Sequence, residues 1–334
     1  MKTPIAGLHH VTAIASDPQR NLDFYTQVLG LRFVKRTINF DDPGTYHFYF
    51  GDDTGKPGTI LTFFPWPHAR KGQMGAGEVI ATAFSIPVGS KEFWHDRLKA
   101  NGIAVQEHTR FDSQVISFSD RDGMVIELVE QEEAHPGAAP RYSDVPGSKA
   151  IQGFYGVTLL ERSLEDTETV LEIMGLRKVA EEGNAENERL IRFAPEGYAL
   201  GRFVDIKLDA AARHGRMGAG TVHHIAFRNT DDAAQAEWRR TLARYLSVTP
   251  VQDRTYFHSI YFREPGGVLF EMATDNPGFL IDEPIESLGE ELRIPEWYEP
   301  NRSAMEAQIL PITLHKAAVA KEETATDETI GASR

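Results

Sequence analysis

The segment Met74–Phe84 reads MGAGEVIATAF, and the segment Met217–Phe227, 143 residues later (217 − 74), reads MGAGTVHHIAF. A second pair of segments is related in the same way, because Gly7–Thr12 (GLHHVT) returns 146 residues later as Gly153–Thr158 (GFYGVT). Self-similarity at a fixed spacing predicts that the two halves of the chain share one fold. The copies have glycines and apolar residues in common, as a shared fold requires. Histidines occur in only some copies, so we interpret the histidines as functional.

Length and composition restrict the class of protein. A chain of 334 residues with 41% apolar and 25% charged residues fits two soluble globular domains. It contains no apolar run of about 18 residues and no N-terminal secretory signal, so we expect no membrane association and a cytoplasmic location. The absence of cysteine excludes disulfides, thiolate ligands and a cysteine nucleophile. The net charge of −14 makes nucleic acid an unfavourable partner.

Each half divides into two units with one pattern, namely a strand, a helix and three strands. In the first unit, Leu8–Ala15 alternates as a strand, and Asp17-Pro18 opens a helix that ends at Gly30. The turn residues between apolar runs predict three further strands, around residues 32–39, 45–50 and 58–64. The other three units are predicted at residues 78–131, 153–208 and 221–274.

A segment rich in proline, alanine and glycine, residues 132–149, separates the two halves. We therefore predict an N-terminal domain at residues 1–140 and a C-terminal domain at residues 150–300. The remaining residues, 301–334, are predicted to be a partly disordered tail, because their last part lacks a hydrophobic face.

Strand parity selects one histidine from each His-His pair. Neighbouring residues on a strand point to opposite faces, so only one member of each pair faces a cavity. His10 and His224 are repeat-equivalent, whereas their neighbours His9 and His223 share a parity with large apolar residues. The parity of His10 and His224 carries mostly small residues, namely Thr12, Ala83, Thr158 and Ala226. We predict that His10 and His224 face the cavity.

A carboxylate occupies the last strand of two units. Glu271 in the fourth unit is matched by Glu127 in the second, 144 residues earlier (271 − 127), and by about Thr62 in the first. The third unit offers only the region Gly201-Arg202 at this position. A glutamate that faces a barrel interior is costly unless it is paired or bound to a metal.

The distribution of these residues predicts which units share a cavity. Pairing the first unit with the fourth collects His10, His224 and Glu271, with Thr62 at the vacant corner. Pairing the units in sequence order would leave only two ligands in each barrel. Two imidazoles and one carboxylate form the facial triad of non-haem Fe(II) oxygenases, and Mn(II) accepts the same ligands. Glu127 is left without histidines, and we interpret it as salt-bridged or partly exposed.

Residues 5–275 resemble the vicinal oxygen chelate superfamily, which includes glyoxalase I and the extradiol dioxygenases. Three segments, Pro43–Asp52, Gly218–Phe227 and Glu264–Phe279, are similar to its hydroquinone ring-cleaving dioxygenase branch. The resemblance implies an α+β fold, in which four βαβββ modules form two tandem glyoxalase-like domains that close into open β-barrels. In that branch the metal ligands also come from the first and fourth units.

The resemblance further implies a set of residues around the metal ligands. These catalytic or supporting residues are His9, Thr12, His223, Arg254 and Tyr261. Because Arg254 and Tyr261 differ in strand parity, both can serve one pocket only if Arg254 lies on a turn or a bulge intervenes. Weaker pocket candidates are Thr62, Tyr256 and His258. We expect surface or loop positions for the other histidines, namely His47, His68, His95, His108, His135, His214 and His315.

The resulting hypothesis is a cytoplasmic, Fe(II)-dependent, extradiol-type dioxygenase of aromatic compound degradation, which opens the ring of a hydroquinone-like diol with O2. A homodimer is compatible with this fold. One alternative is a glyoxalase-type isomerase or lyase, although that chemistry usually employs four protein ligands and Thr62 leaves this chain one short. Another alternative is a non-catalytic protein of the same superfamily that sequesters a ligand. Fold alone does not separate the three.

Overall fold

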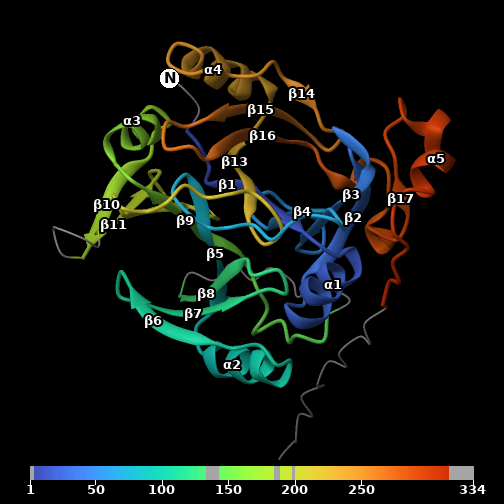
Figure 1. Cartoon of the computed structure of the whole chain (residues 1–334), viewed down its shortest axis with the longest axis horizontal. Coiled ribbons are helices and arrows are strands. Elements are labelled where there is room, and N and C mark those ends of the chain that lie inside the picture. The colour runs from blue at the N-terminus through green and yellow to red at the C-terminus, as the bar shows by residue number, and fades with distance from the viewer. Residues whose placement is uncertain (1–3, 133–142, 184–188, 198–199, 316–334) are drawn as a thin grey trace, which may run out of the picture.

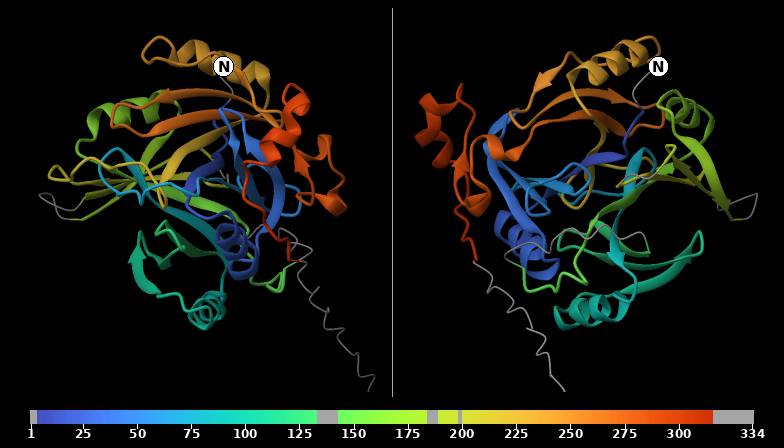
Figure 2. Two further views of the ribbon diagram at one scale, coloured as in Figure 1. Left: turned by 45° about the vertical axis from the view of Figure 1, so that its right-hand side comes forward. Right: turned by 180° about the vertical axis from the view of Figure 1, so that it is seen from behind.

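The computed structural model describes residues 4–132, 143–183, 189–197 and 200–315. Within these residues the strands form two curved sheets, one above the other in Figure 1, and the longer helices lie on their outer faces. Figure 2 shows the same arrangement from two further directions.

The first sheet has nine strands in the spatial order β14-β15-β16-β13-β1-β4-β3-β2-β17. Their bounds are β1 (Leu8–Ala15), β2 (Arg32–Asn39), β3 (Asp42–Gly51), β4 (Ile60–Pro65), β13 (Val222–Asn229), β14 (Gln252–Asp253), β15 (Phe257–Arg263), β16 (Leu269–Pro277) and β17 (Leu292–Arg293). This sheet combines strands of the first and fourth units.

The second sheet has eight strands in the order β10-β11-β12-β9-β5-β8-β7-β6. Their bounds are β5 (Glu78–Pro87), β6 (Gln106–Arg110), β7 (Ser113–Ser119), β8 (Val125–Gln131), β9 (Gly153–Glu161), β10 (Arg177–Glu182), β11 (Arg189–Ala194) and β12 (Phe203–Leu208). It combines the second unit with the third. Both sheets are joined at their centres by antiparallel first strands, β1 with β13 and β5 with β9. The predicted fold and the predicted pairing of units are therefore confirmed.

Each unit contributes one main helix. The helices are α1 (Pro18–Asp23), continued by the π-helical turn η1 (Phe24–Val28), α2 (Lys91–Ala100), α3 (Glu165–Ile173) and α4 (Asp232–Leu242). As predicted, the Asp17 side chain caps α1 by accepting a hydrogen bond from the Arg20 amide, and Gly30, at φ +69°, follows its end.

Every one of these helices packs a large side chain against its sheet. Tyr25, Trp94, Leu171 and Trp238 are all buried in one apolar cluster between the helices and the sheets. Burial of such a side chain stabilises the fold by roughly 1.5–3 kcal/mol. Because the apolar residues of the strands face the helices, the opposite, concave face of each sheet is free for polar residues.

The chain after β16 runs along the outer edge of the first sheet. It includes the short helical turns η2 (Phe279–Ile281), η3 (Ile285–Ser287) and η4 (Glu299–Asn301) and the helix α5 (Arg302–Glu306). The buried ammonium of Lys35 on β2 pairs with Asp282, at 2.6 Å, and with Glu283. Within the predicted tail, residues 301–315 are part of this edge, and residues 316–334 lie outside the described residues.

Among the described residues, no helix is long and apolar enough to cross a membrane. The domain boundaries at residues 140 and 150 remain a prediction.

Candidate metal centre and pocket

Three side chains from three adjacent strands converge on the concave face of the first sheet. They are His10 on β1, His224 on β13 and Glu271 on β16. The two Nε2 atoms lie 3.3 Å apart, and Glu271 Oε2 lies 3.2 Å from His10 Nε2 and 2.9 Å from His224 Nε2. All three residues are buried. The candidate ligand atoms that strand parity selected thus lie close together.

The carboxylate of Glu271 is held in one orientation. Its Oε1 accepts a hydrogen bond from the Ser259 hydroxyl on β15, whereas its Oε2 accepts no hydrogen bond from any residue described and faces the two imidazoles. A buried carboxylate oxygen that faces two ring nitrogens and has no hydrogen-bond partner among the described residues is available to a metal ion.

His9 determines which nitrogen of His10 carries a proton. Burial lowers the pKa of His9 well below its usual value, so the ring is neutral and has one donor and one acceptor nitrogen. It hydrogen-bonds the backbone of Thr274, and its Nδ1 lies 2.9 Å from Nδ1 of His10. If its donor is used on the carbonyl, His9 Nδ1 accepts a hydrogen bond from the N–H at His10 Nδ1. The lone pair of His10 Nε2 then faces Glu271.

The fourth unit repeats this arrangement. His223 Nδ1 lies 2.7 Å from His224 Nδ1, and burial lowers the pKa of His223 to about 3, so this ring is neutral as well. The two Nε2 atoms and the carboxylate oxygen lie within 3.3 Å of one another, and three potential ligand atoms at this separation can share one cation. The residues fit a divalent metal, and partners behind ligand histidines are the usual means of fixing their tautomer.

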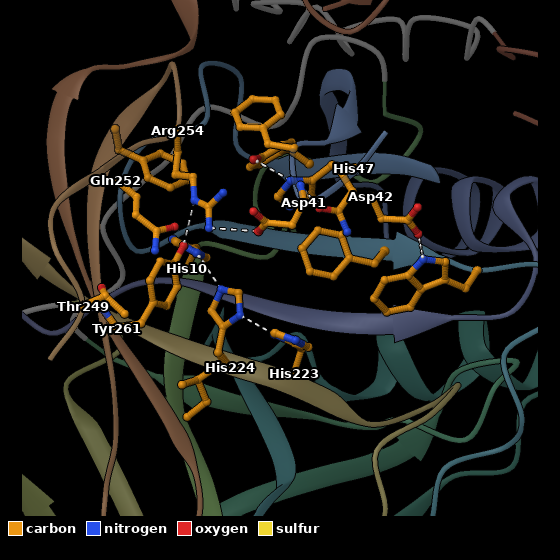
Figure 3. Close-up of a pocket in the computed structure, with 17 residues that line it drawn as sticks. His10, Asp41, Asp42, His47, His223, His224, Thr249, Gln252, Arg254 and Tyr261 are labelled. Atoms are coloured by element: carbon orange, nitrogen blue, oxygen red, sulfur yellow. Dashed lines mark hydrogen bonds and ion pairs between the residues drawn. The ribbon is translucent and has the colours of Figure 1, made fainter. Parts of the chain in front are cut away.

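A cavity of about 430 Å³ opens beside this cluster. Arg254 and Tyr261 both line it (Figure 3), and Arg254 Nε donates to the Tyr261 hydroxyl at 3.2 Å. Arg254 lies just after β14 and before Thr255, whose φ is +68°. The parity difference between the two residues is therefore resolved by a turn. Burial raises the pKa of Tyr261, so its hydroxyl remains protonated and can donate.

The cavity also contains His47, for which the surface or loop prediction was wrong. His47 lies on β3, lines the cavity, and contacts the Tyr49 hydroxyl at 2.9 Å and Thr62 Oγ1 at 3.0 Å. Burial lowers its pKa well below the usual value. The feature that could have identified His47 is its place among aromatic residues on β3, the strand that pairs with the strand of Thr62. Ser259 could have been found by comparing the repeats, because the equivalent residue 144 positions earlier (259 − 144) is the apolar Val115.

The remaining predicted site residues divide into two groups. Thr12 Oγ1 lies 2.7 Å from Thr62 Oγ1, which places both threonines behind His47 and beside the cluster. Tyr256 is directed away from the cavity, since it donates to Asp282 and stacks on Phe279. His258 also lies elsewhere, because it pairs with Asp232 at 2.6 Å next to α4.

The second sheet encloses a cavity of the same size, about 430 Å³, without histidine ligands at the equivalent positions. Glu127 is buried there and forms an ion pair with Arg110 at 2.6 Å, as its salt-bridge interpretation required. The equivalent of Thr62 is Asp205. Asp205 on β12 lies opposite Thr158 on β9 in the sheet, just as Thr62 on β4 lies opposite Thr12 on β1. The prediction of Gly201-Arg202 for this position was wrong, because Gly201 corresponds to Gly58 and Asp205 follows Gly201 by four residues, as Thr62 follows Gly58.

The fold and the site define the class of protein. Residues 7–128 match the family model described as the Glyoxalase/Bleomycin resistance protein/Dioxygenase superfamily. The chain belongs to this superfamily, and its resemblance to the ring-cleaving dioxygenase branch is confirmed, as is the prediction of an enzyme of this type. A maize (Zea mays) glyoxalase I structure, with a TM-score of 0.62 and 12% identity over 83% of this chain and 96% of that chain, shares the fold.

Three relatives describe the branch more closely. The protein assigned as ring-cleaving dioxygenase MhqO of Bacillus subtilis is 47% identical over 93% of this chain and 97% of its own length. The chlorohydroquinone/hydroquinone 1,2-dioxygenase of Sphingobium indicum is 34% identical over 87% of this chain and 91% of its own length. A crystal structure of a Bacillus subtilis protein assigned as a dioxygenase has a TM-score of 0.88 and 46% identity, covering 94% of this chain and 99% of that chain.

Proposed function

We propose that this protein is an Fe(II)-dependent dioxygenase that opens the ring of a hydroquinone next to one of its hydroxyl groups. The observation that carries the proposal is the convergence of His10, His224 and Glu271 beside a cavity large enough for a substituted benzene ring. A cis arrangement of two imidazoles and one carboxylate leaves coordination positions free on the opposite side. The substrate class follows from the name of the Sphingobium relative. Mn(II) is the alternative metal.

The metal would be held by Nε2 of His10, Nε2 of His224 and Oε2 of Glu271. An Fe(II) ion held there supplies a Lewis acid for a phenolate and the redox chemistry that activates O2. Ser259, His9 and His223 fix the orientation of the three ligands.

The residues of the cavity would bind the ring and move its protons. Tyr261, whose pKa is raised, donates a hydrogen bond to an oxygen of the substrate, and the guanidinium of Arg254 lowers the energy of negative charge that develops there. His47 lies on the cavity wall, where its two ring nitrogens contact the Tyr49 hydroxyl and Thr62 Oγ1, so it would shape the wall beside the ring. Trp66, Phe64 and Phe257 form apolar walls that exclude water.

The test is O2 consumption after anaerobic reconstitution with Fe(II), with 2-methylhydroquinone, chlorohydroquinone and catechol in parallel. We expect one O2 consumed per ring with a hydroquinone and no consumption with the variant Glu271→Gln. Faster turnover of catechol than of either hydroquinone would contradict the proposed substrate class. Tight metal binding without O2 uptake from any diol would favour the glyoxalase-type isomerase or lyase.

One observation favours the dioxygenase over that isomerase. The fourth corner of the centre is Thr62, whose hydroxyl is engaged by Thr12 and His47, so the corner offers no second carboxylate. A retained three-residue cluster also disfavours a ligand-sequestering protein, since such a pocket needs no open metal positions.

A further inference from the structure

The two cavities contain repeat-equivalent arginines. Arg110 and Arg254 are 144 residues apart (254 − 110), the same spacing as Glu127 and Glu271. Arg110 ends β6, and Arg254 follows β14 directly. In both cases the next residue has a positive φ, at +47° for Phe111 and +68° for Thr255. The two side chains therefore start from the same place in their units and have the same reach.

In the second cavity this arginine takes the place that a metal would have. Arg110 Nη1 and Nη2 donate to the two oxygens of Glu127, at 3.2 and 2.6 Å, and Nη1 also donates to Thr158 at 3.2 Å. Its Nε lies 3.4 Å from Asp205. These three partners are the repeat-equivalents of Glu271, Thr12 and Thr62. A bidentate guanidinium satisfies a buried carboxylate as fully as a bound cation does.

In the first cavity the equivalent guanidinium is turned away from Glu271. Arg254 Nε donates to the Tyr261 hydroxyl, and Nη2 lies 3.1 Å from Asp41 Oδ2 (Figure 3). The guanidinium carbon lies 5.3 Å from the centre of the Tyr261 ring. Asp41 belongs to the turn between β2 and β3, so it reaches Arg254 from the first unit, across the cavity.

We propose that Asp41 is a positioning residue that holds Arg254 away from Glu271 and so keeps the carboxylate available to the metal. The inference rests on the metal centre of the proposed function. The comparison is with the second cavity, where Arg110, an arginine of the same reach, binds the equivalent carboxylate of Glu127. Tyr261 restrains Arg254 from the other side, and the second cavity has Ser117 at that position, 144 residues earlier (261 − 117). Asp41 is nevertheless the only one of the two that carries a charge.

The expected loss of metal affinity follows from the solvent exposure of the ion pair between Asp41 and Arg254. The side chain of Asp41 is 74% exposed and that of Arg254 is 17% exposed. An ion pair with one exposed partner stabilises modestly, so its loss would weaken metal binding at Glu271 by at most about fivefold. Arg254 can compete with a metal ion for Glu271 because this carboxylate is buried and its Oε2 has no hydrogen-bond partner among the described residues.

The experiment measures metal affinity without diol or O2, by competition of Mn(II) and anaerobic Fe(II) against a chelator. We expect Asp41→Asn to bind metal about twofold to fivefold more weakly than the parent, and Asp41→Glu to bind as the parent does. The double variant Asp41→Asn/Arg254→Gln should regain parental affinity, because the competing guanidinium is gone. The matched control is Asp144→Asn, which removes an exposed carboxylate, 63% exposed, from the 13% exposed Arg97 elsewhere. It should not change metal affinity.

A crystal structure of metal-free Asp41→Asn provides a second readout, in which we expect the Arg254 guanidinium on Glu271. Unchanged affinity of Asp41→Asn would overturn the proposal, and so would a double variant that binds as weakly as the single one. These affinities do not involve turnover. If the affinity changes are as expected but the dioxygenase assay fails, only the proposed function is rejected. If the parent chain binds no metal, both the proposed function and the role of Asp41 are rejected.

Discussion

At the scale of single residues, Glu127 and Glu271 occupy the same position of two repeat units but have opposite surroundings. Arg110 neutralises Glu127, whereas Glu271 faces two imidazoles and one serine hydroxyl. The difference results from the neighbours of each glutamate rather than from its own strand. The same comparison explains why a carboxylate inside a barrel is not sufficient evidence for a metal site.

We predict that Glu271→Gln abolishes stoichiometric metal retention, because an amide replaces the only charged ligand and binds divalent metals poorly. The measurement is the metal content of reconstituted protein after gel filtration. Its matched control is Glu127→Gln, which removes the equivalent carboxylate from the other cavity and should leave one metal per chain. Equal metal loss in both variants would contradict the assignment.

Glu161 at the end of β9 gives a pH-dependent prediction. It is buried, its Oε1 accepts no hydrogen bond from a described residue, and burial together with the nearby Glu264 raises its pKa to about 8. The folded state therefore keeps a proton that the unfolded state releases near pH 4.5. Because the folded state binds more protons between these values, this group's contribution to stability is complete below pH 4.5 and is lost as the pH rises to 8.

The variant Glu161→Gln removes this titration. We expect its free energy of unfolding to exceed that of the parent by roughly 1–2 kcal/mol at pH 8.5, with a smaller difference at pH 5. Urea denaturation at the two pH values measures the change. A variant that is destabilised equally at both would show that Glu161 contributes through packing instead.

At the scale of elements, each concave sheet face is occupied by a buried polar network that joins two units. In the second sheet, Arg110 on β6 bonds Glu127 on β8 and lies 3.4 Å from Asp205 on β12, which also pairs with Arg192 at 2.8 Å. These contacts cross from the second unit to the third. In the first sheet, the predicted metal centre spans the equivalent junction.

We predict that Arg110→Met destabilises the fold by about 3–5 kcal/mol, because it leaves a buried carboxylate without its cation. The free energy of unfolding in urea measures the loss. Arg189→Met serves as the control, since it removes a partly exposed arginine that pairs with Glu181 on the same sheet, and such pairs contribute at most about 1 kcal/mol. Similar losses in the two variants would mean that the buried network has no special stabilising role.

Much of the element level was predictable from the sequence. The alternation of small and large side chains along β1 and β13 predicted that His10 and His224 face the cavity. The pairing of the first unit with the fourth was predicted because only this pairing collects three ligands in one barrel. His47 was not predictable from the repeats, because its environment depends on how β3 approaches β4 and brings Tyr49 and Thr62 beside it. The position of Asp205 depends on the register of β12 with β9, in which Asp205 lies opposite Thr158. Strand parity is a local property, but cross-strand register and cross-strand contacts are not.

At the scale of the whole molecule, the predicted centre is shared by the two halves of the chain. His10 comes from the first half, and His224 and Glu271 come from the second, because β1 pairs with β13. The exchange of units also explains why the edge segment after β16 returns to β2, where Lys35 binds Asp282 and Glu283. This segment was not predictable, since its residues follow no repeat.

We predict that residues 1–140 and residues 150–334, expressed separately, each fail to retain stoichiometric metal, because neither contains all three ligands. Coexpression of the two pieces should restore one metal per pair of pieces. Gel filtration with metal analysis provides the measurement. Full metal retention by the second piece alone would show that His10 is not a ligand.

The most direct test of the metal centre is anomalous diffraction at the iron absorption edge from crystals reconstituted anaerobically with Fe(II). We predict one anomalous peak per chain, about 2.0–2.2 Å from Nε2 of His10, Nε2 of His224 and a carboxylate oxygen of Glu271. No peak is expected beside Glu127, where Arg110 occupies the equivalent place. A peak at Glu127, or iron bound without contact to all three of the predicted ligands, would contradict the proposed centre.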